Sequence, residues 1–358
     1  MKILHTADIH ITVPDDQRWQ ALEVILAAAR RHQADVLVIS GDLFNASYQG
    51  DRVRDKIRPL FQSFPGQILL LPGNHDFQAF EDGYFWGQNV QVILDSRRPI
   101  RIDNIYFWGL PYQDISPEEL AYQLTELNQR AQQLSADAVH LLLFHGELLD
   151  VRPDPDAFGD ENQRLYMPVQ QDHFRGKIWQ YVLAGHYHTR FKAYEMEPGK
   201  YFVYPGSPVS ITRKEVGIRK VNLFSPGHPP REVPVATFHY ELLHLTITPQ
   251  DRWPSFRKRL QQRLQSLPPT AKPLITVGGH FDSQKLGLTE DGIHQALREL
   301  LREEAAEFSL QAIDIHRIVS DDLFETLQET IKNGREFTPE DQRELIEFLI
   351  SIMAEEAG

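Results

Sequence analysis

Five short apolar segments of the chain each end in residues that can bind a divalent metal. The terminal fragments are Asp8-Ile9-His10, Gly41-Asp42, Gly73-Asn74-His75-Asp76, His145-Gly146 and Gly185-His186-Tyr187-His188. In an open α/β sheet, the loops beyond the carboxyl ends of the strands converge on one crevice. Five separate segments can therefore bring their ligands to a single point, and this pattern favours a layered α/β fold.

Strand and helix patterns in residues 1–224 agree with such a fold. We predict strands at Lys2–Thr6, Val36–Ser40, Gln67–Leu71, Ile105–Gly109, Val139–Phe144, Tyr181–Ala184 and Tyr201–Tyr204. Between the first two strands, Leu22, Ile25 and Leu26 share one face of an amphipathic helix over Asp16–His32.

Four prolines between Ser225 and Pro234 predict an irregular boundary. Beyond it we expect a small β-α-β-α-β cap, whose first helix has Asp251 as N-cap and whose second helix has Thr289. The expected cap elements are strands over Phe238–Ile247, Leu274–Phe281 and Leu310–Val319 and a helix over Asp251–Leu267, followed by a final helix from Thr338. The predicted organisation is a core over residues 1–224, an α/β capping domain over 225–320 and an acidic helical segment over 321–358.

Composition limits the kind of site and the compartment. The net charge is −13, but residues 321–358 hold 11 acids and 3 bases, which leaves −5 for the rest, so a local basic groove stays open. The chain has no cysteine, which excludes disulfides and thiolate metal ligands and fits a cytoplasmic protein. The longest apolar runs are far too short to span a membrane.

The candidate metal ligands offer only nitrogen and oxygen. They are Asp8, His10, Asp42, Asn74, His145, His186 and His188. Such a set suits Mn, Fe, Zn, Co or Ni. It is too large for one tetrahedral zinc, and it suits two ions roughly 3.5–4 Å apart that clamp both oxygens of an in-line phosphoryl displacement.

The spacing of the paired ligands carries a further expectation. Asp8 and His10, like His186 and His188, stand at alternate positions, so we expect each pair to point to the same side of an extended segment. Any one of these fragments alone has an ordinary explanation, such as a surface histidine or a Gly-Asp turn. Their joint occurrence predicts the two-metal site.

The motif series resembles that of the calcineurin-like metallophosphoesterase superfamily. Within it, Ile3–His10, Gly41-Asp-Leu-Phe44 and Tyr204–Pro208 resemble the DNA-repair exonuclease branch, the SbcD-like nuclease subunits. The resemblance covers residues 1–224 well and the cap loosely. It implies a two-sheet sandwich flanked by helices, with a small α/β cap domain and a helical C-terminal tail.

The resemblance also implies roles for the site residues. One metal would be held by Asp8, His10, Asp42 and His188, and the other by Asp42, Asn74, His145 and His186, with Asp42 bridging. His75 matches a catalytic histidine that is not a ligand and that stabilises or protonates the leaving oxygen. The nucleophile would be a hydroxide held by the two ions, which we expect to be Mn²⁺. Asn45 departs from the branch pattern, so the role of that position is open.

The implied activity is that of a DNA exonuclease or endonuclease subunit of an SbcCD-like double-strand-break repair complex. Its expected partners are DNA, a second copy of the chain, and an SMC-like coiled-coil ATPase (SbcC-like) that docks the C-terminal helix. The apolar stripe of that helix comprises Leu345, Ile346, Phe348, Leu349, Ile352 and Met353. Packing of the stripe on the chain's own cap is the alternative. The alternative activity is a phosphodiesterase or phosphatase for a small nucleotide or a phosphoprotein.

Basic and aromatic residues supply candidate DNA contacts. The basic candidates are Arg257, Lys258 and Arg259 in the cap, and Arg213 and Lys214 in the core. Such residues neutralise phosphates along a groove, although a solvated face paired with acids explains each of them equally well. Tyr187 and Phe77 stand beside ligands, where they would stack on a frayed base unless they pack in the interior.

Overall fold

The computed structural model describes residues 1–80, 84–134, 137–150, 165–301, 307–316, 322–334 and 337–357. The chain forms two compact units, Met1–His239 and Tyr240–Gly358, and each is described by itself. None of the helices in these ranges combines the length and the apolar character that a membrane span requires.

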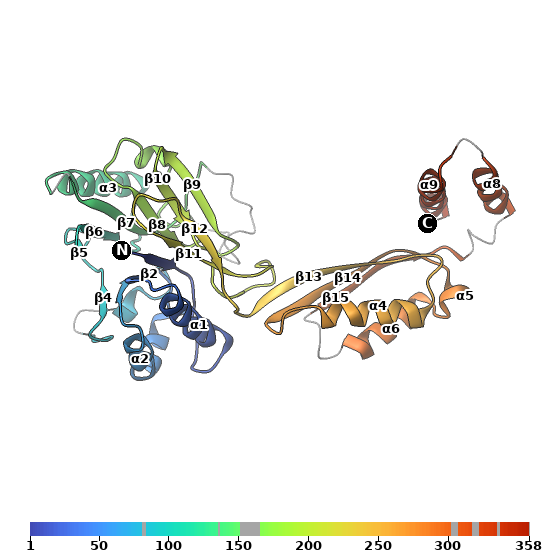
Figure 1. The fold of residues 1–358 in the computed structure, drawn as a ribbon, viewed down its shortest axis with the longest axis horizontal. Helices are drawn as coiled ribbons and strands as arrows, with labels where there is room; N and C mark the ends of the chain where they lie inside the picture. The colour runs from blue at the N-terminus through green and yellow to red at the C-terminus, as the bar shows by residue number, and fades with distance from the viewer. Residues whose placement is uncertain are drawn as a thin grey trace. The chain divides into compact units, whose positions relative to one another are not determined.

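Two six-stranded sheets form the N-terminal unit (Figure 1). The first has the order β12-β11-β1-β2-β3-β4, and the second has the order β5-β6-β7-β8-β10-β9. The strands of the first sheet are β1 (Ile3–Thr6), β2 (Val36–Ser40), β3 (Gln67–Leu71), β4 (Val90–Val92), β11 (Lys220–Phe224) and β12 (Arg231–Pro234). Those of the second are β5 (Ile100–Ile102), β6 (Ile105–Leu110), β7 (Val139–His145), β8 (Tyr181–Gly185), β9 (Lys192–Glu197) and β10 (Lys200–Tyr204).

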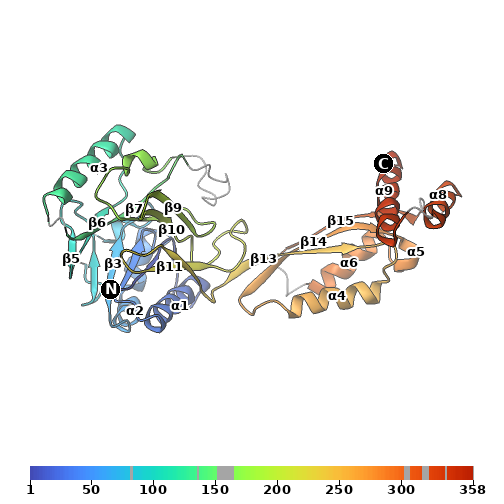
Figure 2. The same cartoon turned by 45° about the horizontal axis from the view of Figure 1, so that its top comes forward.

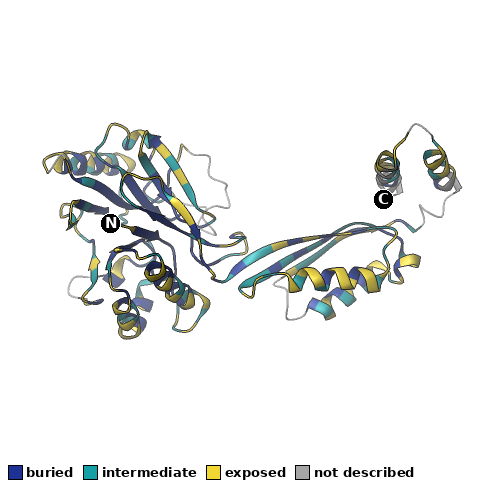
Figure 3. Cartoon of the chain, viewed as in Figure 1, coloured by how far each residue is buried: buried dark blue, intermediate teal, exposed yellow. Residues whose placement is uncertain are grey.

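The two sheets pack face to face, and helices cover their outer faces. Side chains such as Val38 and Leu69 of the first sheet meet Leu141 and Leu183 of the second in one buried cluster. The outer faces carry separate cores against α1 (Gln17–Arg31) and α2 (Ser47–Gln62) on the first sheet and against α3 (Pro117–Gln132) on the second. The strands at the centre of this unit are accordingly almost uniformly buried (Figure 3). The predicted two-sheet sandwich flanked by helices is confirmed.

Parallel pairing directs the predicted ligands to one edge of each sheet. β1, β2, β3 and β4 are mutually parallel, as are β6, β7, β8 and β10. The strands that precede the metal-binding fragments therefore all end on the same side of their own sheet. Because the apolar cluster between the sheets holds the two layers together, these strand ends are fixed close to one another.

The C-terminal unit contains a three-stranded sheet in the order β13-β14-β15. Its elements are β13 (His239–Ile247), α4 (Trp253–Gln265), β14 (Ala271–Phe281), α5 (Ser283–Leu286), α6 (Glu290–Leu301), β15 (Glu307–Asp314), α8 (Asp322–Asn333) and α9 (Pro339–Ala357). Figures 1 and 2 show α4 and α6 on the same face of this sheet, and one apolar cluster joins them to it. The order is the predicted β-α-β-α-β with one addition, the four-residue helix α5 between β14 and α6.

The cap helices differ from expectation at one end. Thr289 does cap α6, since its hydroxyl accepts the Gly292 N–H. Asp251, however, is not an N-cap. Arg252 occupies that position, and the Asp251 carboxylate instead accepts from the Thr248 N–H and pairs with Arg259. The Asp251 carboxylate is thus occupied by Thr248 and Arg259 and does not accept from the first amides of α4.

The expected irregular boundary contains a strand. Arg231–Pro234 forms β12, which pairs antiparallel with β11 at the edge of the first sheet. Prolines are tolerated on an edge strand because one side of it needs no donors. The first compact unit accordingly runs to His239 rather than 224. The expected boundary at 320/321 and the end of the strand predicted over Leu310–Val319 lie outside the described residues, so the division into cap and tail stays a prediction.

The apolar stripe of α9 is partly used within the chain. Ile350 is buried with Ile315 and Phe324, and Ile346 and Leu349 pack against them. Phe348 and Ile352 are 63% and 42% exposed. The side chain of Met353 lies outside the described residues. One side of the stripe therefore packs within the chain, as the alternative expects, while docking of an ATPase on the exposed side stays a prediction.

Burial of His5 in β1 gives the stability of this unit a predictable pH dependence. Burial lowers the pKa of His5 to about 3, and Asn222 donates to its Nδ1 at 3.5 Å. Between pH 6.5 and 3 the unfolded chain binds a proton at this residue while the folded chain does not, so stability falls as pH falls. We expect a loss of about 2 kcal/mol between pH 7.5 and 5.0 that is absent from His5→Gln.

Tryptophan fluorescence during urea unfolding in EDTA measures this difference, because four of the five tryptophans lie in the N-terminal unit. The same substitution at exposed His244 is the control and should keep the wild-type pH dependence. An unchanged pH dependence in His5→Gln would show that the buried imidazole does not contribute.

Candidate metal centre

The loop after β1 and the loop after β8 bring three predicted ligands together. The Nε2 atoms of His10 and His188 lie 3.3 Å apart, and His188 Nε2 lies 3.8 Å from Asp8 Oδ1. All three side chains are buried. One donor atom from each lies within 4.8 Å of the other two, which is close enough for a single ion to contact all three.

Asp42, directly after β2, lies between this group and a second one. Its Oδ2 atom is 3.6 Å from His10 Nε2 and 3.3 Å from His145 Nε2. Its Oδ1 accepts the backbone N–H of His75 at 3.0 Å. A donor-atom cluster of Asp8, Asp42 and His145 also falls within 4.8 Å. The geometry thus places Asp42 where the predicted bridging carboxylate would be.

Asn74 and His186 approach the second group from other strands. Asn74 Oδ1 lies 2.9 Å from His145 Nε2. The His186 ring centroid lies 5.4 Å from that of His145, and the backbone N–H of His186 donates to both oxygens of Asp8. Among the described residues, His186 joins none of the donor clusters within 4.8 Å.

His75 lies beside this centre and is held by its own backbone contacts. Its Nδ1 is 3.1 Å from the carbonyl oxygen of Asn45, and its ring meets that of His10 edge to face at 4.8 Å. A donor atom of His75 also clusters with His10 and Asp42. Asn45 has a structural role here, because its side chain accepts from Arg18 at 3.0 Å while its carbonyl orients His75.

Left-handed backbone conformations turn the ligands inward. Asp8, His10, Asp42 and His186 have φ of 55°, 54°, 51° and 93°. The paired ligands therefore do not stand on extended segments as expected, although Asp8 and His10 still reach one donor cluster. Non-glycine residues seldom adopt such values, and they cluster at functional sites where the surroundings enforce them. At Gly41, with φ of 97°, a Cβ atom would lie 1.9 Å from His145 Nδ1, so only glycine fits.

The charges of the centre are strongly coupled. Burial disfavours a charged His145, yet Asp42 and its hydrogen bond outweigh burial and raise the pKa of His145 to about 10. Burial likewise opposes ionisation of Asp42, but His145 and His10 lower its pKa below the usual range. Burial raises the pKa of Asp8 and lowers that of His10. The carboxylate of Asp42 thus depends on positive charge around it.

These residues fit a pair of divalent cations. Asp42 Oδ2 is fully buried and lies 3.3 and 3.6 Å from the Nε2 atoms of His145 and His10, an oxygen and nitrogen set that also binds a divalent cation. The His145 Nδ1 faces the carbonyl oxygen of Ser40 at 2.9 Å, which fixes the tautomer that leaves Nε2 as the ligand atom. Oxygen and imidazole donors of this kind suit Mn²⁺, Fe, Zn, Co or Ni.

Three buried acids next to the centre have no role predicted from the sequence. Glu215 Oε1 lies 3.5 Å from His188 Nδ1, and Glu147 Oε1 lies 3.5 Å from His186 Nε2. Asp76 accepts the N–H groups of Gly73 and Phe44. Burial and then the Asp42 charge raise the pKa of Asp76 to about 7. Of the three, only Asp76 could have been found from the sequence, because it belongs to the Gly-Asn-His-Asp motif. Glu147 and Glu215 lie in loops that show no recognisable motif.

The candidate DNA contacts divide between the units. Arg213 and Lys214 are exposed in the loop that holds Glu215 against His188. Arg257 and Lys258 are exposed on α4 in the other unit. Arg259 forms a bidentate ion pair with Asp251, which balances its charge. All five stay predictions.

The two candidate aromatic residues have different environments. Tyr187 is buried, and its ring packs on that of Tyr204 at 5.3 Å. Of the two expectations for Tyr187, packing in the interior is the one that holds, because its ring belongs to the apolar core of the second sheet. Phe77 is 48% exposed.

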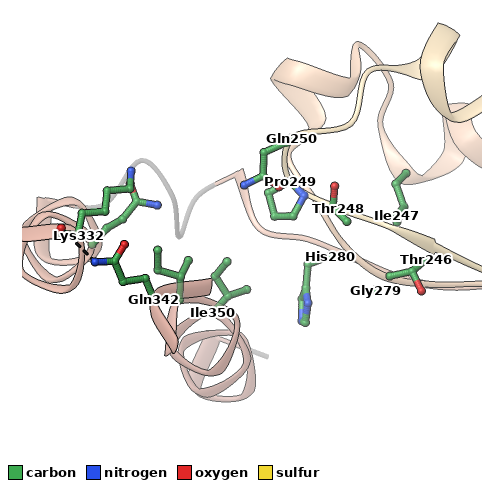
Figure 4. A pocket seen from close by; sticks show the side chains of 12 residues that line it. Thr246, Ile247, Thr248, Pro249, Gln250, Gly279, His280, Lys332, Gln342 and Ile350 are labelled. Atoms are coloured by element: carbon green, nitrogen blue, oxygen red, sulfur yellow. Dashed lines mark hydrogen bonds between the residues drawn. The ribbon is translucent and has the colours of Figure 1, made fainter. Parts of the chain in front are cut away.

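The C-terminal unit contains a cavity of about 790 Å³ (Figure 4). It lies between the β13–α4 and β14 region and the helices α8 and α9, where Gln342 donates to the carbonyl oxygen of Lys332. His280 is the one imidazole among the described lining residues, and none of them is Asp or Glu. This cavity therefore lacks the donor set of a metal site.

Three curated proteins illustrate what the chain is similar to. It is 24% identical to the D subunit of the SbcCD nuclease of Staphylococcus epidermidis, over 67% of this chain and 73% of that protein. It is 27% identical to the corresponding protein of Staphylococcus saprophyticus, over 42% of this chain and only 43% of that protein. It is also 27% identical to the 3′,5′-cyclic adenosine monophosphate phosphodiesterase CpdA of Escherichia coli, over 41% and 56%.

The model of the calcineurin-like phosphoesterase family matches residues 1–190. This range is more than half of the chain, and it contains every predicted metal ligand as well as His75. The chain therefore belongs to the calcineurin-like phosphoesterase family.

Proposed function

We propose that the chain is a Mn²⁺-dependent DNA exonuclease or endonuclease that acts in the cytoplasm as the nuclease component of an SbcCD-like repair complex. The buried Oδ2 atom of Asp42, which lies 3.6 and 3.3 Å from the imidazoles of His10 and His145, is the observation that carries the phosphoesterase part. The similarity to two SbcD nucleases, one of them across most of both chains, supports the DNA part.

The metals would be held as the motif predicts. Asp8, His10, Asp42 and His188 would hold one ion, and Asp42, Asn74, His145 and His186 the other. Bound there, two divalent ions supply Lewis-acid activation of the phosphodiester and of the attacking water.

His75 is the residue that we assign to proton transfer. The contact between its Nδ1 and the Asn45 carbonyl oxygen fixes the tautomer, and Asp42 holds its backbone N–H. We assign Nε2 to the leaving oxygen, where a positioned acid contributes a rate factor of about 10²–10⁴. The cluster with His10 and Asp42 keeps this ring at the edge of the metal centre.

The basic loop 213–214 is the part of the core that we assign to DNA phosphates. Glu215 contacts His188 and so fixes one side of this loop. Arg219, at the end of the loop, donates to the carbonyl oxygens of Ser207 and Thr189. The two exposed bases are therefore held next to the metal centre. Arg257, Lys258 and Arg259 of α4 are a second candidate track.

The exposed side of α9 is the surface that we assign to a coiled-coil ATPase. Phe348 and Ile352 are large apolar side chains left open to solvent on that helix. A homodimer of the nuclease remains part of the proposal and rests on the resemblance alone.

The alternative is a phosphodiesterase or phosphatase for a small nucleotide or a phosphoprotein. The match to CpdA favours this alternative, because that cyclic nucleotide phosphodiesterase is 27% identical to 41% of this chain, an identity similar to those of the SbcD nucleases. The two functions differ in what they require beyond the metals. DNA needs a basic track and shows steep salt dependence, whereas a small nucleotide needs only a pocket.

Removing the charge of Glu215 should weaken metal binding. In Glu215→Gln the side chain keeps its shape, but only the amide oxygen can accept, so one of the two N–H groups of Ile211 and Thr212 loses its acceptor. The imidazole of His188 then has no anionic partner there. Partners of this kind change metal affinity by about 10- to 100-fold. Calorimetric Mn²⁺ titration should show this decrease for Glu215→Gln and none for Glu118→Gln on the surface of α3. An unchanged Mn²⁺ affinity in Glu215→Gln would show that Glu215 does not position His188 for metal binding.

The DNA assignment predicts salt-dependent nuclease activity. The wild-type protein with Mn²⁺ should degrade linear duplex or single-stranded DNA, with activity falling markedly between about 50 and 200 mM salt. The salt dependence of DNA binding tests the basic loop. In the double variant Arg213→Gln/Lys214→Gln, the slope of the logarithm of the DNA association constant against the logarithm of the salt concentration should decrease in magnitude by about 0.9 for each duplex phosphate that is no longer neutralised. Arg97→Gln/Arg98→Gln removes the same charge from another exposed pair and should keep the wild-type slope.

Turnover of a cyclic or mononucleotide without any action on DNA at low salt, even with an SbcC-like ATPase supplied, would replace this proposal by the alternative.

A further inference from the structure

We propose that a cavity beside the metal centre binds the nucleobase next to the phosphate that is hydrolysed. The cavity has a volume of about 830 Å³ and lies within the N-terminal unit. Asn74 and His75 form part of its wall, so a nucleotide whose phosphate reaches the metal centre has this space beside it. This inference rests on the proposed function only in taking the substrate to be a phosphate ester of a nucleotide.

Two partly exposed aromatic rings line the cavity, and the Arg52 guanidinium lies 5.1 Å from the centre of one of them, Tyr48. Phe77 begins the short 3₁₀ helix Phe77–Phe80 and is 48% exposed, and Tyr48 at the start of α2 is 57% exposed. Tyr112, half-buried, lies in the wall as well. Nucleobases stack on aromatic rings irrespective of their identity because each has a π-face.

The exposure of Phe77 is enforced by its neighbours rather than being a frayed end. Phe80, at the other end of the same short helix, is buried and stacks on Phe44 at 5.7 Å. The Ala79 N–H donates to the Asp76 carbonyl oxygen, directly after the metal-site residues. The buried Phe80 and the Asp76–Ala79 hydrogen bond thus hold this short helix in place, and Phe77 lines the cavity.

The charge of the lining selects a base over a phosphate. None of the ten described residues that line the cavity is Lys or Arg, and one of them is Asp114. A carboxylate in the lining disfavours a backbone phosphate there, and Arg52, which lies over the Tyr48 ring at 5.1 Å, is not itself one of the described lining residues. Ser47, Gln78 and Gln113 instead offer neutral polar groups that suit a flat, uncharged ring with donors and acceptors on its edge.

The size agrees with this assignment. Small-molecule sites in proteins measure about 300–1,000 Å³. A cavity of this volume accommodates a purine with its sugar and leaves space for water. It does not discriminate a deoxynucleotide within DNA from a free nucleotide, so the inference holds for either substrate.

Calorimetry with paired ligands tests the inference directly. The Mn²⁺-loaded full-length protein is titrated with 2′-deoxyadenosine 5′-monophosphate and with 2-deoxyribose 5-phosphate, which has the same phosphate and sugar but no base. We expect the wild-type protein to bind the nucleotide about tenfold more tightly. Phe77→Ala should abolish this preference, and Phe77→Tyr, which keeps a ring, should retain it. Tyr122→Ala, at an exposed tyrosine on α3, should behave as wild type.

Equal affinity of the wild-type protein for the two ligands would overturn the inference, as would an undiminished preference in Phe77→Ala. The DNA proposal is judged separately. DNA degradation by a protein without the base preference would refute the base cavity alone. A base preference that disappears in Phe77→Ala, in a protein that does not degrade DNA, would support the cavity and refute the nuclease proposal.

Discussion

The buried carboxylate of Asp42 is the interaction on which the site depends. It accepts the His75 N–H after β3 and lies within 3.6 Å of imidazoles from the β1 loop and from the end of β7. A buried anion without opposite charge costs several kcal/mol. The convergence of these chain segments is therefore stable only when imidazoles and bound cations balance Asp42.

The sandwich supplies the rigidity that such a centre requires. The apolar cluster between the sheets fixes the separation of the strand ends, and the helices cover both outer faces. Polar clamps reinforce it near the ligands. The buried Arg219 donates to the carbonyls of Ser207, His188 and Thr189, while Tyr204 accepts from the Leu148 N–H and donates to the Gly146 carbonyl. Together these contacts offset the left-handed conformations of the ligand residues, which each cost of order 1–3 kcal/mol.

Strand periodicity and the metal-binding fragments allowed much of the core to be predicted. β2 and β3 have the bounds expected from the sequence, and the predicted ligands meet at one edge. What escaped prediction depends on three-dimensional neighbours. Asp8 leaves the extended conformation while its carboxylate accepts the backbone N–H of His186, and Glu215 reaches His188 across 27 residues of chain. Edge strands such as β12, with prolines, carry no apolar alternation that would reveal them.

The number of metal ions bound per chain tests the central claim most directly, because it does not depend on the identity of the substrate. We expect anomalous diffraction and metal analysis of Mn²⁺-loaded wild-type protein to find two ions per chain, with Asp42 in contact with both. Asp42→Asn keeps the shape but not the charge, and it should hold at most one ion tightly. A single ion in the wild-type protein, or two ions held with wild-type affinity in Asp42→Asn, would contradict the two-metal account.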